Sequence, residues 1–314
     1  MIKFMIIIRF CGGLGNQMFQ YAMYLSLKQK YPNNVVKAEI FHYNIENEHN
    51  GFELTKVFNL DIDYATKKEL RKVFNGIIFD EKYSCFPPII KSFLLKSFQN
   101  RYLSLANRVF VQKSKMLIFD DPENRFVKKI NQLENGNWYL RGFWQRTDYF
   151  EKIRNCILKS FNLTCKLSKN DLELCNLLLS GKCIAVHVRG GDFISPKYNL
   201  CDFSYYSKAL KKIKSSLPLI VFTDDVNYAK NLFQKFTVKA FVSHDISKSK
   251  IDMYMMSMSK KIILSNSTFS FWGAYLSTIK NQCVIAPKYA SLDGTIYRLF
   301  PKRNSWIIVD NKKT

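Results

Sequence analysis

The sequence predicts an α/β fold built from two Rossmann-like domains, and two patterns lead to this prediction. From Asp171 onward, apolar runs with strand character alternate with helix-like segments of about ten residues, which is typical of a parallel sheet covered on both faces. The chain also opens on a strand-like run, a glycine-rich turn and a helix-like segment. Its 314 residues, 47% of them hydrophobic, suffice for two buried cores.

In the first half, a strand over 4–10 leads through the turn CGGLGNQ into a predicted helix over 17–31. Glycine allows a tight turn here, and the N–H groups before a helix suit a phosphate group or a closely bound sugar, although many such turns serve packing alone. The stretch 41–137 is irregular and rich in aromatic residues. It either shapes an acceptor cleft or fills the core.

Strands and helices alternate through the second half of the chain. The predicted helices span 171–180, 203–216, 226–236, 249–259 and 269–279, and the predicted strands span 183–188, 217–225, 238–245, 260–266 and 281–287. Parallel strands joined by right-handed crossovers have their carboxyl ends at one edge, where open α/β sheets bind ligands. The predicted functional edge carries the polar residues near those ends, which are Arg189, Asp224, His244 and Ser265.

The net charge of +23 suits anionic partners, namely polyanions, anionic membrane surfaces or phosphorylated substrates. An ordinary lysine-rich surface is the simpler explanation, and peripheral contact with an anionic membrane is the alternative. Nucleic acid is not an expected partner, because no helix-turn-helix, RNP or zinc-finger pattern occurs and the basic residues are dispersed.

The sequence also predicts a cytoplasmic location, at the inner face of the membrane if that contact exists. No window approaches the roughly 18–20 apolar residues that span a bilayer, and the apolar start MIIIRF is too short for a signal-peptide core. The eight cysteines include no C-x-x-C pair, which favours reduced thiols over a zinc site or a disulfide framework.

The segment HVRGGDF at 187–193 follows directly after an apolar strand. Two glycines and mixed charges are poorly suited to a core, but they present backbone N–H groups and an arginine to an anion. Three further segments combine glycine or polar residues with a neighbouring apolar run. They are GGLGNQMFQYA at 12–22, VFTDD at 221–225 and LSNSTFSFWGAYLS at 264–277.

Together these four segments resemble, in order, the α-1,2-fucosyltransferases of bacterial surface-glycan synthesis, glycosyltransferase family 11, whose signature is H-x-R-R-x-D. FWQRTDYFEKI at 143–153 resembles a further segment of that family. The resemblance implies a GT-B-like fold, with two Rossmann-like domains facing each other across a cleft. It also implies inverting, metal-independent transfer of L-fucose from GDP-β-L-fucose to the O2 hydroxyl of a galactoside.

On this reading, residues 1–160 form an acceptor-side domain and residues 161–290 a GDP-sugar-binding domain. Residues 291–314 form a tail that is expected to pack back on the N-terminal domain. The partners are GDP-fucose and a galactose-containing oligosaccharide or lipid-linked glycan. No cofactor or metal is expected, because no D-x-D precedes an apolar strand and no His/Cys cluster occurs.

The resemblance places Arg189 against the donor diphosphate, where a guanidinium stabilises the charge on the departing GDP. Asp192 is the nearest candidate for the catalytic base, or it orients Arg189. His187 and one of Asp224 or Asp225 are expected to read guanine, whose N1 and N2 protons a carboxylate can accept together.

Two turns complete the expected donor site. The first contributes Gly13, Gly15 and Asn16. The second contributes Ser267, Thr268, Phe269 and Ser270, whose hydroxyl groups exceed what capping one helix requires.

The chain departs from the family pattern at Gly190, where the signature has a second arginine. If that arginine orders the loop, activity survives its loss and Gly190→Arg has no effect. If it touches phosphate, Gly190→Arg is tolerated or improves donor affinity. If it contacts the donor, the chain uses another GDP-sugar or linkage, binds the donor more weakly, or compensates through Lys197 or Arg141. A non-catalytic GDP-sugar or glycan-binding protein is the alternative outside enzymes.

Overall fold

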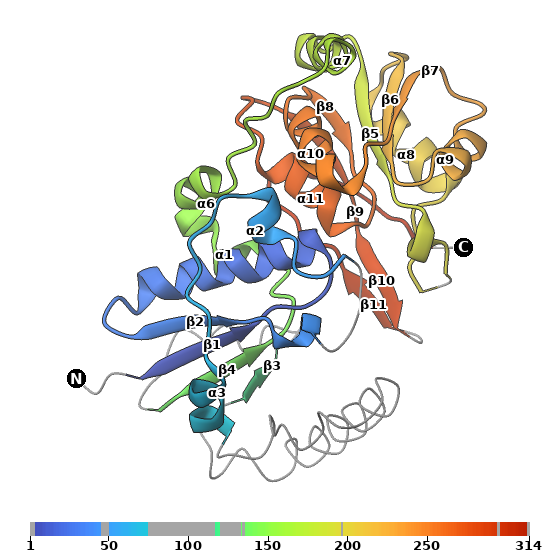
Figure 1. Cartoon of the computed structure of the whole chain (residues 1–314). Helices are drawn as coiled ribbons and strands as arrows, with labels where there is room; N and C mark the ends of the chain where they lie inside the picture. The colour runs from blue at the N-terminus through green and yellow to red at the C-terminus, as the bar shows by residue number, and fades with distance from the viewer. Residues whose placement is uncertain are drawn as a thin grey trace. The chain divides into compact units, whose positions relative to one another are not determined.

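The computed structural model of the chain describes residues 4–44, 50–74, 117–119, 133, 136–195, 197–293 and 296–312. Two compact units are present, one formed by Met1–Trp144 with Asp148–Ile157 and the other by Gln145–Thr147 with Leu158–Thr314. Each unit is built on a parallel sheet, which confirms the predicted α/β class (Figure 1). The predicted arrangement of two domains facing a cleft stays a prediction.

The first unit has, within the described residues, a four-stranded parallel sheet in the order β2-β1-β4-β3. Its core begins with the isoleucine run of β1, because Ile6 to Ile8 are fully buried and β-branched side chains pack well on a pleated sheet. The strands are β1 (Met5–Arg9), β2 (Val35–Glu39), β3 (Leu117–Phe119) and β4 (Trp138–Arg141).

Helix α1 (Leu14–Lys30) follows β1 and confirms the predicted strand, turn and helix. It begins three residues earlier than predicted because Gly13 is its N-cap. The short helices of this unit are η1 (Phe41–Asn44), α2 (Leu54–Val57), α3 (Lys67–Phe74), η4 (Glu151–Ile153) and the start of α6 (Arg154–Ser160). Most of the irregular stretch 41–137 lies outside the described residues, including its segments CFPPII and KSFLLKSF.

The second unit has a parallel sheet whose described strands follow the order β12-β9-β8-β5-β6-β7. Strand β5 is therefore central, and β8 and β6 are its neighbours. The strands are β5 (Ile184–Val188), β6 (Leu219–Thr223), β7 (Val238–Val242), β8 (Lys261–Ile263), β9 (Cys283–Pro287) and β12 (Ile307–Val309). β10 (Tyr289–Asp293) and β11 (Ile296–Leu299) form a separate antiparallel pair.

The helices of the second unit confirm the predicted alternation. They are α7 (Lys169–Ser180), α8 (Phe203–Ile213), α9 (Val226–Leu232), α10 (Ser249–Ser257) and α11 (Thr268–Tyr275), with the short turns η5 (Gly191–Ile194) and η6 (Ile246–Lys248). The turn η3 (Thr147–Tyr149) begins in this unit and ends in the first. Helices α8 and α9 pack on one face of the sheet, while α10 contacts α7 and α11. Local sequence fixes the ends of α7, because Ser168 and Asp171 form a capping box and Gly181 takes the left-handed conformation.

The C-terminal tail contributes to the second sheet. Ile307–Val309 form β12, which pairs with β9 as an edge strand. This part of the tail thus packs beside β9, and the predicted packing of the tail on the N-terminal domain stays a prediction.

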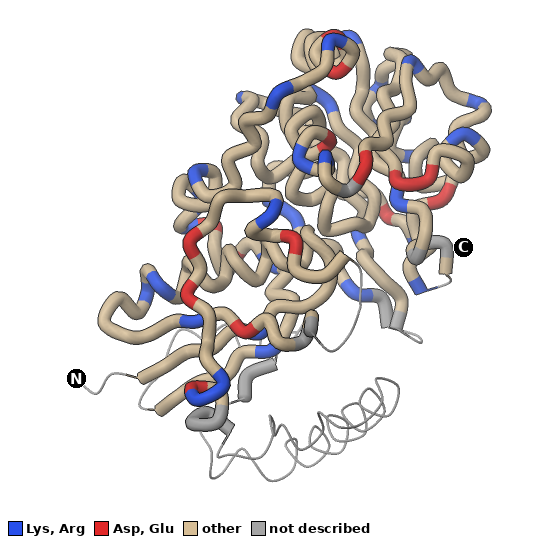
Figure 2. The backbone as a smooth tube through the Cα atoms, in the orientation of Figure 1, with Lys and Arg blue, Asp and Glu red and all other residues tan. Residues whose placement is uncertain are grey.

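Basic residues are dispersed over the part of the chain that the structure describes. Figure 2 shows Lys and Arg spread over both units. Among the described residues, no helix combines the length and the apolar character needed to cross a bilayer. The cysteines that the structure describes are all free thiols.

Candidate functional site

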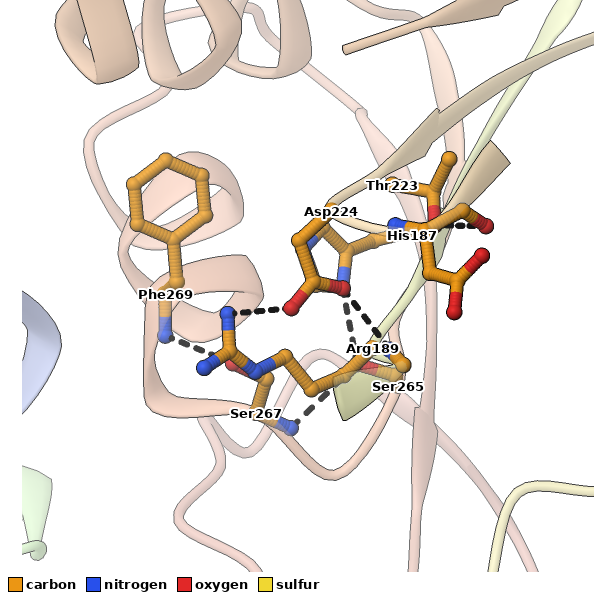
Figure 3. A network of polar contacts seen from close by, with 9 residues as sticks. His187, Arg189, Thr223, Asp224, Ser265, Ser267 and Phe269 are labelled. Atoms are coloured by element: carbon orange, nitrogen blue, oxygen red, sulfur yellow. Dashed lines mark hydrogen bonds and ion pairs between the residues drawn. The ribbon is translucent and has the colours of Figure 1, made fainter. Parts of the chain in front are cut away.

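Three loops of the second unit come together at the carboxyl edge of its sheet, after the neighbouring strands β8, β5 and β6 (Figure 3). They contain most of the residues that the sequence predicted for this edge. The contacts among them define the candidate site.

His187 lies near the end of β5 and is 5% exposed. Its Nδ1 atom is 2.8 Å from the hydroxyl oxygen of Ser265, which follows β8, and its backbone carbonyl accepts a hydrogen bond from Tyr206. Burial and, to a lesser extent, the positive charge of Arg189 together lower the pKa of His187 to about 3. The imidazole is therefore neutral at physiological pH and connects two loops of the site.

Arg189 follows β5 and pairs with a carboxylate at the end of the neighbouring strand. Its Nη1 atom is 2.7 Å from Oδ2 of Asp224, and each side chain is about one-third exposed, at 31% and 35%. The other carboxylate oxygen of Asp224 accepts a hydrogen bond of 2.7 Å from the backbone N–H of Gly190. The guanidinium carbon also lies 5.6 Å from the centre of the Phe193 ring. A partly exposed cation is thus held in one direction at the sheet edge.

Asp225 has a different partner from its neighbour. It is the N-cap of α9, where Oδ1 accepts a hydrogen bond from the backbone N–H of Tyr228, and its own backbone bonds to the Thr223 hydroxyl. The two consecutive aspartates of VFTDD therefore have separate local roles, which sequence reasoning left undecided.

Gly190 corrects one expectation. A Cβ atom placed there would lie 2.5 Å from the Cβ atom of Asp225, a distance that real structures essentially never show. Because both atoms are fixed by the backbone, a longer side chain cannot avoid this contact by rotating. The expected tolerance of Gly190→Arg is therefore wrong for this backbone, in which the glycine permits close packing between two loops.

The turn before α11 and the first turn of that helix contain the two predicted serines, and both are buried. Ser267 caps the helix through a 3.3 Å contact from the backbone N–H of Phe269. Ser270 is fully buried, and its hydroxyl donates to the carbonyl oxygens of Ser265 and Ser267. Ser270 therefore stabilises the turn from inside. Because its hydroxyl is buried, it is not placed to contact a bound GDP-sugar as predicted. Thr268 and Phe269 are half-buried at the helix start.

One residue of this turn was missed. Asn266 is 5% exposed, and its side-chain amide donates to the carbonyl oxygens of Tyr198 and Ala290. It ties the turn after β8 to two other segments. The only sequence signal was a polar residue within SNSTFS, which reads equally well as a capping residue.

The side chain of Asp192 lies outside the described residues, so its roles as base or as partner of Arg189 stay predictions. Lys197 lies 5.2 Å from the Tyr198 ring centre, and Arg141 ends β4 in the other unit. Compensation by Lys197 or Arg141 for the arginine absent at position 190 stays a prediction.

The glycine-rich turn of the first unit is held by side chains that the sequence did not single out. Gly12 has φ +77°, and a Cβ atom there would lie 2.6 Å from the Asn16 amide nitrogen. Gln17 is fully buried, donates to the Gly12 carbonyl and accepts from the backbone at residues 53 and 54. Gln20 accepts from the N–H of Cys11 and donates to the Gly142 carbonyl.

These glutamines fix the backbone around the three residues predicted from that turn. Gly13 caps α1, and Gly15 and Asn16 lie in its first turn. Both turns are built as helix N-termini, which attract anions. The contribution of the first-unit turn to donor binding stays a prediction.

His244 follows β7 but does not join this cluster. Its Nδ1 atom is 2.5 Å from Asp252 of α10, and its Nε2 atom is 3.4 Å from Asp171 of α7. Both carboxylates are buried, and burial raises the pKa of Asp252. His244 thus connects two helices to the sheet edge. Within the described residues, no three His, Cys, Asp or Glu side chains are grouped so that they could hold a metal ion.

The chain is similar to a protein family and to several known proteins. The model of Glycosyl transferase family 11 matches residues 5–308. An Escherichia coli alpha-1,2-colitosyltransferase is 30% identical over 302 residues, which cover 90% of this chain and 91% of that protein. The Escherichia coli O-antigen biosynthesis glycosyltransferase WbnK is 29% identical over 297 residues, covering 88% and 92%. The solved fucosyltransferase NodZ from Bradyrhizobium is 14% identical with a TM-score of 0.45, covering 88% and 93%.

Proposed function

The chain belongs to glycosyl transferase family 11, and on this premise we propose that it transfers L-fucose from GDP-β-L-fucose to the O2 hydroxyl of a galactoside in a surface glycan. The observation that carries the proposal is Arg189, a partly exposed cation at the carboxyl end of a central strand, held in one direction by Asp224. Ligands of parallel sheets bind at this edge, and a guanidinium matches a diphosphate.

The proposed reaction is an inverting displacement. The acceptor O2 attacks C1 of fucose from the side opposite the phosphate, the bond between C1 and the phosphate oxygen breaks, and GDP leaves with the electron pair. The acceptor proton passes to a base, for which Asp192 is the candidate. Arg189 and the N-terminus of α11 stabilise the negative charge on GDP, so this proposal needs no metal ion or other cofactor.

Recognition of the nucleotide is assigned to His187 and to one of Asp224 or Asp225. A neutral imidazole can donate or accept a hydrogen bond without the cost of burying a charge, which fits a buried position. The base-reading carboxylate would discriminate guanine from adenine by about 1–3 kcal/mol, because adenine does not offer the paired N1 and N2 protons.

A second donor is favoured by one specific relative. The alpha-1,2-colitosyltransferase shares 30% identity with this chain over nearly its whole length. A colitose donor is therefore the alternative to fucose. A non-catalytic protein that binds GDP-sugars or glycans is the alternative to both.

A donor screen tests the proposal. GDP-fucose, GDP-colitose, GDP-mannose, UDP-galactose and ADP-glucose are titrated by calorimetry, and GDP release is followed without acceptor. Binding of GDP-fucose with slow GDP release supports the transferase. Preference for GDP-colitose selects the alternative donor, tight binding without release selects the binding protein, and equal affinity for all nucleotides contradicts the whole proposal.

The acceptor and the location are parts of the same proposal. The acceptor is a galactose-containing oligosaccharide or lipid-linked glycan, used in the cytoplasm at the inner membrane face. Nucleic acid has no part in it. The net charge of +23 supports contact with an anionic membrane.

A further inference from the structure

The carboxylate of Asp224 contacts the HVRGGDF loop with both of its oxygen atoms. Oδ2 lies 2.7 Å from Nη1 of Arg189, and Oδ1 accepts the backbone N–H of Gly190 at 2.7 Å. One side chain from the end of β6 thus fixes both the guanidinium and the backbone that follows β5. We infer that Asp224 is a positioning residue for Arg189, and this inference rests on the proposed function.

The loop is shaped around this carboxylate. Gly191 has φ +52°, and the nearest heavy atom to a Cβ built there would be Oδ2 of Asp224, at 3.6 Å. Gly190 has no room for a side chain because of Asp225. Gly190 therefore lets the loop come close to the segment after β6, and Gly191 allows the left-handed backbone conformation that follows it.

The geometry favours this role over guanine reading by Asp224. To accept the N1 and N2 protons of guanine, a carboxylate must present both oxygens to the base. Here each oxygen already accepts a contact from the loop, so each would have to accept a second one in the direction of the base. The guanidinium carries five N–H groups in a planar fork. A contact through Nη1 fixes the direction of this fork, which decides where a diphosphate can be bound in a bidentate manner.

The energetics separate positioning from a role in folding. An ion pair with both partners about one-third exposed contributes little to stability. Misplacing a group that acts on the transition state costs much more in rate, on the order of 10²-fold for about 1 Å. Loss of Asp224 is therefore expected to lower turnover far more than stability.

The test compares wild type, Asp224→Asn, Arg189→Ala and the double variant. Asp224→Asn keeps an acceptor for Gly190 but loses the charge. We expect its kcat to fall by about 10–100-fold with a smaller change in the donor KM, and an effect of less than about twofold when Arg189 is already alanine. Additive losses in the double variant overturn the inference.

Asp63→Asn is the matched control, because Asp63 forms an exposed ion pair with Lys28 in the first unit, at 2.8 Å. It is expected to change Tm as little as Asp224→Asn while leaving kcat unchanged. Nucleotide binding supplies a second readout, the affinity ratio of GDP to IDP, since IDP lacks the N2 amino group. If Asp224 only positions Arg189, this ratio keeps its wild-type value in Asp224→Asn. A ratio that falls to about one overturns the inference and shows that Asp224 binds guanine.

A spectroscopic readout separates failure of this inference from failure of the proposed function. The ¹⁵Nε signal of Arg189 is identified by its absence in Arg189→Ala. It is expected to show a slowly rotating guanidinium in wild type and an averaged one in Asp224→Asn. A wild type that neither transfers sugar nor prefers GDP contradicts the proposed function, whereas an Arg189 signal unaffected by Asp224→Asn overturns the positioning role.

Discussion

A Cβ atom on Gly190 would lie 2.5 Å from the Cβ atom of Asp225. The glycine therefore has a packing role, which predicts that Gly190→Ala and Gly190→Arg both destabilise the protein, by about 1–3 kcal/mol, as other overpacked sites do. Chemical denaturation measures the change. Asp225→Gly removes the opposing Cβ while leaving an acceptable N-cap, so Gly190→Ala should cost less in that background. Equal costs in both backgrounds would show that the contact is not the cause.

The neutral His187 predicts a pH dependence of stability. Its folded-state pKa of about 3 lies below the ordinary value of 6.5, so between these values the unfolded state binds a proton that the folded state does not. Stability therefore falls as pH decreases through this window, with a contribution of about 1.4 kcal/mol per pH unit. The free energy of unfolding of His187→Asn should fall less steeply between pH 6 and about pH 4. Parallel curves for the two proteins would contradict the burial of an uncharged imidazole.

The contacts of His244 predict a structural role. His244→Ala would remove a hydrogen-bond partner from the buried Asp252 and a neighbour from the buried Asp171, at a cost of about 1–3 kcal/mol. Its affinity for GDP should match that of wild type when both are measured well below their melting temperatures. Unchanged stability combined with lost GDP binding would place His244 in the site instead.

The proposed chemistry predicts that transfer does not depend on a divalent cation, because Arg189 and the start of α11 supply positive charge to the leaving diphosphate. Excess EDTA should change the transfer rate by less than about twofold relative to untreated enzyme. Loss of activity that Mn²⁺ restores would reveal a metal-dependent step.

Sequence reasoning located the sheet edge but not the pairings along it. The strands that precede Arg189 and Asp224 were predictable because each is an apolar run followed by a charged residue. Their pairing follows from the order β8-β5-β6, which periodicity within one strand does not specify. Likewise, Asp171, His244 and Asp252 meet only because α7 and α10 lie side by side.

Other residues were missed because burial depends on what covers a segment. Gln17 and Gln20 are polar positions in a helical pattern and look like solvent-facing residues, yet both are fully buried and bond to backbone. From the sequence, Gly190 was interpreted only as a position that lacks the family's second arginine. The sequence does not show how closely the side chain of Asp225 approaches this glycine. Close packing between loops is a property of the folded chain alone.

The central claim is that Arg189 stabilises the departing GDP, and kcat of Arg189→Ala with saturating GDP-fucose tests it most directly. The substitution removes one partly exposed ion pair, so the circular dichroism spectrum and Tm should stay close to wild type. An interaction that strengthens in the transition state lowers kcat when it is removed, and we predict a loss on the order of 10²–10³-fold. Arg189→Lys should recover only a small part, because an ammonium group lacks the bidentate fork. A folded Arg189→Ala protein that transfers fucose at the wild-type rate would contradict the account.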